Sequence, residues 1–97
     1  MSSSTLKELI DELRKEARAY YDKQEGHPNL LPYHTKMRAA LLLERVAETV
    51  DLAWSLSVED RSSIRKLALL LAQNQHGPEP SVIDIILVRD FLKKQKG

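Results

Sequence analysis

The sequence predicts an all-α protein, a compact bundle of four helices with short connections. Three observations support this class. Apolar residues recur at three- and four-residue steps over most of the chain, helix-capping pairs precede these periodic stretches, and Gly or Pro residues separate them. Because 97 residues are near the common size of one domain, we expect a single core and a single domain over residues 1–97.

The first helix is expected over residues 6–24. Thr5 and Glu8 have the spacing in which a hydroxyl and a carboxylate satisfy the first free amides of a helix. Charged residues lie opposite its apolar stripe, which consists of Leu6, Leu9, Ile10, Leu13, Ala17, Tyr20 and Tyr21. Gly26, Pro28 and Pro32 then interrupt the pattern, so the first connection is placed there.

The second helix is expected over residues 30–56 and is the longest predicted element. Asn29 suits its N-cap, and Pro32 is tolerated inside its first turn. The periodic pattern continues to about Leu56, with a main stripe of Ala39, Leu42, Leu43, Val46, Val50 and Ala53.

The last two helices are expected over residues 58–75 and 82–94. Ser57 and Asp60 repeat the capping spacing for the third helix, which Gly77 and Pro78 end. A similar Ser and Asp pair at positions 81 and 84 starts the fourth helix. The β-branched run over residues 82–88 also fits a short buried strand, but a lone strand has no evident pairing partner, so a helix is favoured.

The composition excludes several function classes. Fifteen basic and 14 acidic side chains leave a net charge of +1, which gives no general attraction to nucleic acid or anionic membranes. The absence of cysteine excludes a disulfide scaffold, a thiolate nucleophile and a Cys-ligated metal site. No secretory signal is visible, and no apolar run approaches the ~20 residues of a membrane span, so the cytoplasm is the expected location.

Apolar residues surround the first half of the fourth predicted helix, where only Asp84 is polar. Helices of a small bundle normally keep a solvated face, so this surplus predicts an interface with a second copy or a larger protein. The alternative is a central fourth helix that the other three enclose. We expect a non-enzymatic interaction or assembly module without a cofactor, whose interface residues are Ile83, Ile86, Leu87, Phe91, Leu69 and Leu70.

The junction of the second and third predicted helices suggests an alternative function, a DNA- or RNA-binding accessory protein. Its apolar spacing roughly follows a helix-turn-helix, in which Arg61, Arg65 and Lys66 would contact phosphate or bases. The match is imperfect, because no Gly occupies the turn, the preceding helix is too long, and Glu59 and Asp60 would meet phosphate unfavourably. The aromatic side chains are not interleaved with a basic patch, so packing in or around the core is expected for Tyr20, Tyr21, Tyr33 and Trp54.

Two acidic groups suggest a third function, a carboxylate metal-dependent enzyme. They are Glu8, Asp11 and Glu12 on the first predicted helix, with Glu44, Glu48 and Asp51 on the second. Each group lies opposite the apolar stripe of its helix, so a solvated face is the favoured interpretation. The histidines also lack zinc-site spacing and are expected at the surface or in caps; they are His27, His34 and His76.

Overall fold

Four helices account for most of the computed structural model, which describes residues 4–24, 26 and 29–96. The helices are α1 (Leu6–Asp22), α2 (Leu31–Ala47), α3 (Val58–Gln73) and α4 (Val82–Lys96). Two short strands, β1 (Ser4–Thr5) and β2 (Ser55–Leu56), pair antiparallel, with Ser4 opposite Leu56 and Thr5 opposite Ser55. The prediction of four helices is confirmed, whereas the sequence pattern gives no sign of the small sheet.

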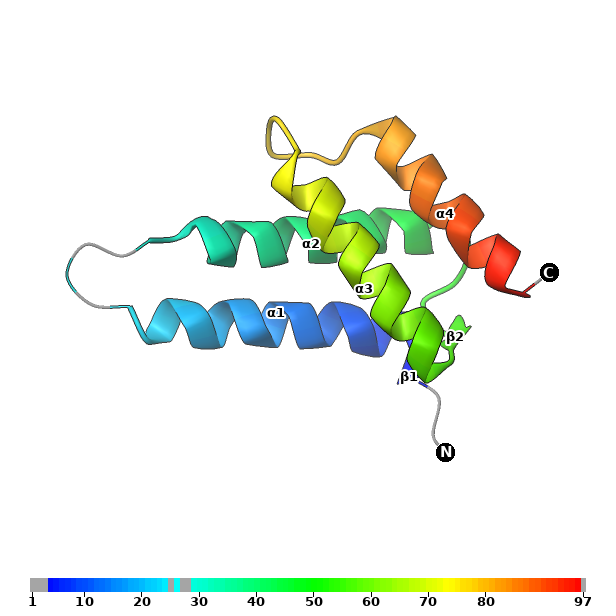
Figure 1. The fold of residues 1–97 in the computed structure, drawn as a ribbon, viewed down its shortest axis with the longest axis horizontal. Coiled ribbons are helices and arrows are strands. Elements are labelled where there is room, and N and C mark those ends of the chain that lie inside the picture. Colours follow the sequence, from blue (N-terminus) through cyan, green and yellow to red (C-terminus); the bar gives the residue numbers. More distant parts are fainter. Residues whose placement is uncertain (1–3, 25, 27–28, 97) are drawn as a thin grey trace.

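The helices form a flat molecule of 48 × 32 × 18 Å. α1 and α2 lie antiparallel to each other, α3 crosses this pair on one side, and α4 runs back beside α3 against the C-terminal half of α2 (Figure 1). Because a helix with its side chains is about 10 Å wide, the short dimension accommodates two helix layers. No described helix therefore covers the side of the α1/α2 pair that faces away from α3.

α2 ends at Ala47, and its predicted extension to residue 56 is wrong. Two local hydrogen bonds turn the chain instead: the Thr49 hydroxyl donates to the Val46 carbonyl at 2.8 Å, and the Ala53 amide donates to the Asp51 carboxylate at 2.8 Å. Short polar side chains compete in this way with the helical backbone pattern. Residues 48–57 consequently form a connection that contains β2.

This connection returns to the beginning of α1. The amides of Leu6 and Lys7 donate to the carbonyls of Trp54 and Leu52, each at 2.9 Å. A helix leaves its first four amides without intrahelical partners, so these contacts satisfy two of them. The Thr5 hydroxyl satisfies a third by accepting from the amide of Glu8 at 3.2 Å, as predicted. The sheet and its flanks thus fix the position of α1 relative to the end of α2.

The starts of α2, α3 and α4 agree only in part with the predicted caps. Ser57 accepts a hydrogen bond from the amide of Asp60 at 3.1 Å, which confirms the predicted cap of α3. Ser81 instead accepts from the amide of Ile83 at 3.1 Å. The N-cap of α2 is Leu30 and makes no side-chain hydrogen bond, so the assignment of Asn29 to that position is wrong. Asn29 still contributes, because its side chain accepts from the amide of Leu31.

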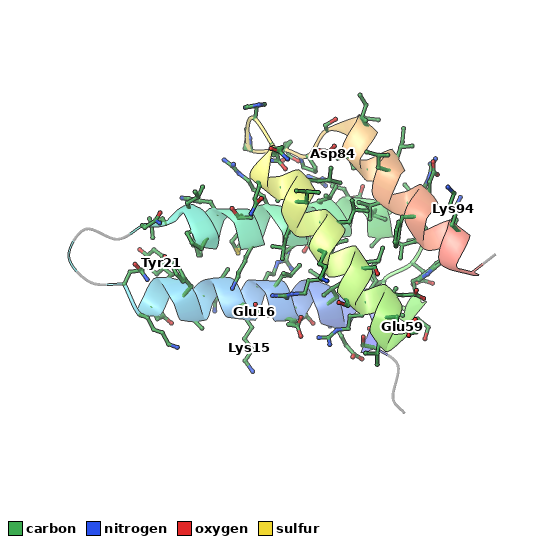
Figure 2. All side chains as sticks on the ribbon, viewed as in Figure 1. Lys15, Glu16, Tyr21, Glu59, Asp84 and Lys94 are labelled. Carbon is green, nitrogen blue, oxygen red and sulfur yellow. The ribbon has the colours of Figure 1, made fainter. Side chains whose placement is uncertain are left out.

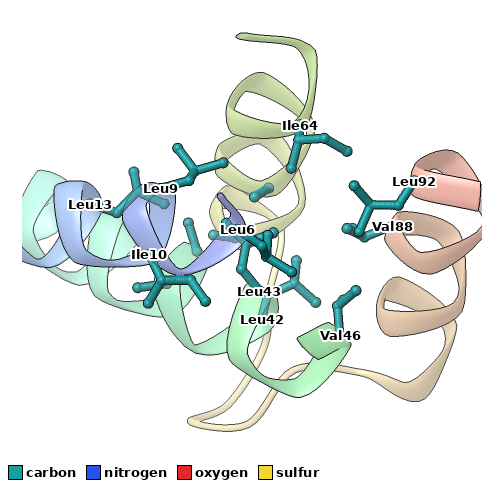
Figure 3. Close-up of a cluster of buried hydrophobic side chains, with 14 of the residues drawn as sticks. Leu6, Leu9, Ile10, Leu13, Leu42, Leu43, Val46, Ile64, Val88 and Leu92 are labelled. Atoms are coloured by element: carbon teal, nitrogen blue, oxygen red, sulfur yellow. The ribbon is translucent and has the colours of Figure 1, made fainter. Parts of the chain in front are cut away.

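One core joins the four helices (Figure 3). Every fully buried side chain of the described residues is apolar. The largest are Leu6, Leu9, Ile10, Leu13, Leu42, Leu43, Val46, Leu56, Ile64, Val88 and Leu92. Residues 82–88 are helical and contribute Val88 to this core, so the alternative of a buried strand is wrong. None of the described helices combines the length and the apolar character that crossing a bilayer requires.

Candidate functional site

α4 has a buried face and an exposed face. Val88 and Leu92 are one helical turn apart and wholly buried, and they point toward Val46 of α2 and Ile64 of α3 (Figure 3). The contact between Arg45 of α2 and Glu79, at 3.1 Å, ties the α3–α4 connection to the end of α2. These contacts fix which side of α4 faces solvent.

Four large apolar side chains occupy that solvent side. Val82 is 69% exposed, Ile83 70%, Ile86 39% and Leu87 50%. Their spacing of one, three and four residues groups them on one side of the first half of the helix. We call these four residues the α4 apolar face. The alternative of a central fourth helix enclosed by the other three is therefore wrong.

The other three predicted interface residues differ in how far they are exposed. Phe91 and Leu69 are partly buried and pack against the core, so they support the fold more than they offer a contact surface. Leu70 is 56% exposed on α3. It lies in the half of α3 that is adjacent to the beginning of α4, since the two helices run in opposite directions (Figure 1).

Charged residues limit the α4 apolar face on its C-terminal side. Asp90, Lys93 and Lys94 are all exposed in the turns that follow Leu87. Figure 2 shows Asp84 near the start of the helix and Lys94 near its end. The outer side of α4 is thus apolar in its first half and charged in its second half.

Two of the three residues predicted to contact nucleic acid are engaged in ion pairs. Arg65 binds Glu16 through two contacts of 3.0 and 2.6 Å and reaches Glu12 at 3.0 Å, and Arg61 also pairs with Glu12. Lys36 of α2 joins the group through Glu16 at 3.2 Å. We call these five residues the α1/α3 ion-pair cluster.

The cluster shifts the ionisation of its members. The hydrogen bonds that Arg65 donates to Glu16 lower the pKa of Glu16 and raise the pKa of Arg65. Lys66, the third predicted contact, is exposed. The connection before α3 spans residues 48–57, whereas a helix-turn-helix uses about three or four residues. The structure therefore does not bring Arg61, Arg65 and Lys66 together as a free basic surface.

The acidic residues considered as metal ligands are dispersed. Glu44 pairs with Arg14, Glu48 with Arg45 at 3.1 Å, and Asp11 with Lys7 at 3.2 Å. Glu12 belongs to the ion-pair cluster, Glu8 is exposed, and Asp51 accepts a hydrogen bond from the amide of Ala53. Within the described residues, no three His, Cys, Asp or Glu side chains gather in a way that could hold a metal ion.

The two histidines among the described residues, His34 and His76, lie in different parts of the fold. The ring of His34 contacts that of Tyr33 with centroids 5.3 Å apart, and His76 is exposed in the α3–α4 connection. His27 lies outside the described residues.

A cleft that the sequence analysis missed lies at the hairpin end of α1 and α2. Its volume is about 660 Å³, and its lining includes Arg14, Arg18, Tyr21, Tyr33 and Met37. We call it the tyrosine cleft. The rings of Tyr21 and Tyr33 are 5.3 Å apart at an interplanar angle of 51°. Arg14, Arg18 and Tyr21 share one flank of α1 while Tyr33 comes from α2, so the fold places basic and aromatic side chains together that are not interleaved in the sequence.

The chain matches no family model, and no curated protein or solved structure shows significant similarity to it.

Proposed function

We propose that this chain is a non-enzymatic protein–protein interaction module, a helical bundle that associates with a second copy of itself through the α4 apolar face. The observation that carries the proposal is the exposure of Val82, Ile83, Ile86 and Leu87, between 39% and 70%, on one side of one helix. Scattered exposed apolar residues are ordinary on protein surfaces, but a contiguous group marks a contact surface.

The charge pattern of α4 favours a second copy in antiparallel orientation. In that orientation the apolar halves of two α4 helices overlap, and the charged halves extend in opposite directions into water. A parallel pair would instead bring Lys93 and Lys94 of one copy beside the same residues of the other, which is unfavourable. An antiparallel pair also has the two-fold symmetry of most protein dimers.

The expected dimer is weak and reversible. Burying a half-exposed Val, Ile or Leu side chain contributes roughly 1 kcal/mol, so the eight side chains of two copies contribute roughly 8 kcal/mol. The loss of translational and rotational freedom costs about 4 kcal/mol or more. The difference is at most about 4 kcal/mol, which corresponds to a dissociation constant of about 1 mM, so association should appear as the protein concentration approaches the millimolar range.

Sedimentation velocity over roughly 10 µM to 1 mM protein tests the proposal. We expect the mean mass of the wild type to rise with concentration, and Ile86→Asp/Leu87→Asp to remain monomeric because each dimer would bury four unpaired carboxylates. The matched control is Leu31→Asp/Val58→Asp, which charges two residues that are 66% and 62% exposed on other elements. The control should associate like the wild type.

Orientation can be tested by cross-linking, because the natural chain has no cysteine. With a short bifunctional thiol reagent, Ile86→Cys should cross-link two copies, since Ile86 lies near the centre of an antiparallel contact. Lys94→Cys should not, since the two ends point away from each other. A wild type that is monomeric at every concentration, or a control that dissociates like the Asp variant, would refute self-association through this face.

A further inference from the structure

The tyrosine cleft combines positive charge with two aromatic rings, the exposed Tyr21 and the half-buried Tyr33, at the hairpin end of α1 and α2, away from α4 (Figures 1 and 2). We propose that it binds a nucleoside phosphate, with the phosphate on Arg18 and the base against Tyr21 and Tyr33. This site is separate from the α4 apolar face and does not depend on self-association.

The positive charge comes from consecutive turns of α1. Arg14 and Arg18 are one turn apart and both line the cleft, and Lys15 adds a third cation at its outer edge. Arg14 pairs with Glu44, but neither Lys15 nor Arg18 has a carboxylate within ion-pair distance among the described residues. An arginine can bind phosphate oxygens through two parallel N–H groups, so Arg18 is the main phosphate ligand of the proposal.

The rings provide the surface for a base. Tyr21 is 53% exposed, although it belongs to the apolar stripe of α1, so a large part of its ring is in contact with water. Tyr33 packs against it and also against His34. Exposed aromatic rings beside cations are the combination by which proteins bind unpaired bases. The volume of about 660 Å³ lies within the usual range for small-molecule sites.

Carboxylates determine where the phosphate can lie. Asp22 also lines the tyrosine cleft and reduces its positive charge, although it is a full turn beyond Arg18. A neighbouring cleft of about 440 Å³ shares Arg14 but is lined by Asp11, Glu44 and Glu48. These three carboxylates would repel phosphate. The anion is therefore favoured only at the hairpin end, beside Arg18.

Titration of ¹⁵N-labelled wild-type protein with ATP, followed by NMR, tests the proposal. We expect saturable shifts of the backbone amides near residues 14–22 and 33–37. Lys15→Ala/Arg18→Ala should weaken ATP binding about tenfold or more, because two charged contacts to phosphate are lost. Tyr21→Ala should weaken it by about fivefold or more, because the base loses a stacking partner.

The control Lys93→Ala/Lys94→Ala removes the same charge from exposed positions on α4 and should leave ATP affinity unchanged. Two further probes separate the contributions of the phosphate and the base. Tripolyphosphate should shift only the amide signals near Arg18, and adenosine only those near the tyrosines. A short single-stranded oligonucleotide shows whether the nucleotide is bound free or within a strand. The absence of saturable ATP shifts, or an equal loss of binding in the α4 control, would overturn the proposal.

Discussion

At the scale of single residues, the arginines of the α1/α3 ion-pair cluster pair with carboxylates of α1, although their chemistry also suits phosphate binding. Arg61 and Arg65 have the chemistry of phosphate ligands, which is why the sequence suggested nucleic-acid binding as an alternative function. Their carboxylate partners lie 49 positions or more earlier in the chain, so no local pattern could reveal the pairing. The same limit applies to the tyrosine cleft, whose two rings come from different helices.

Glu16 provides a prediction for the pH dependence of stability. The hydrogen bond from Arg65 lowers its pKa in the folded protein below the value of 4.5 that is normal for the carboxyl. Its contribution to stability is therefore present above about pH 4.5 and is lost as the pH falls through the lower folded value. We expect Glu16→Gln to reduce the free energy of unfolding by about 1 kcal/mol at neutral pH. The reduction should be smaller near pH 3, because the contribution of the charged carboxyl declines as the pH falls below 4.5.

Urea denaturation of both proteins at the two pH values, followed by far-UV circular dichroism, measures this difference. Glu48→Gln is the matched control, because Glu48 pairs with Arg45 on the surface and its side chain is 65% exposed. It should change stability by at most a few tenths of a kcal/mol. An equal loss in the two variants would show that the Glu16–Arg65 pair has no special role.

At the scale of helices and strands, the starts of α1 and α3 were predictable, and the end of α2 was not. Thr5 and Ser57 form caps that can be recognised from a few neighbouring residues. After Ala47 the apolar spacing continues, although the backbone leaves the helix. The interruption arises from the local bonds of Thr49 and Asp51 and from the pairing of β2 with the N-terminal strand. The short polar side chains of Thr49 and Asp51 are visible in the adjacent sequence, but this signal is weaker than the apolar spacing of a helix. The strand pairing has no signal there.

The cap of α3 can be tested by Ser57→Ala. Loss of the hydroxyl leaves the amide of Asp60 without its acceptor, so we expect the free energy of unfolding to fall by about 1 kcal/mol. Ser63→Ala is the control, because Ser63 is exposed inside the same helix and alanine is the best helix former. It should leave stability unchanged or slightly raised. Thermal unfolding of the two variants gives the comparison, and equal effects would contradict the assignment of Ser57 as a functional cap.

At the scale of the whole molecule, the sequence showed that α4 is apolar on too many sides but not which residues would be covered. Val88 and Leu92 face the core, whereas Ile83 and Leu87 do not. That choice depends on how α4 rests against α2 and α3, which is a property of the assembled fold. The flat shape follows from the same arrangement, and it leaves the α4 apolar face and the tyrosine cleft at different ends of the molecule (Figure 1).

The single core predicts that α4 unfolds together with the rest of the chain. Leu92 is wholly buried, so Leu92→Ala should reduce the free energy of unfolding by about 2–5 kcal/mol. Trp54 packs against the same core from the α2–α3 connection, so its fluorescence reports on a part of the molecule outside α4. The fluorescence and circular dichroism transitions in urea should coincide and shift together. Separate transitions would mean that α4 detaches independently.

The pairing of residues 4–7 with residues 52–56 also sets the order in which a newly synthesised chain can fold. The amides of Leu6 and Lys7 find their acceptors in a segment that a ribosome releases only after both α1 and α2 have been made. The helical hairpin forms from nearby contacts, which are fast, and the strand pair closes a much longer loop. β1 and the start of α1 are thus the last part of the hairpin to be secured during translation.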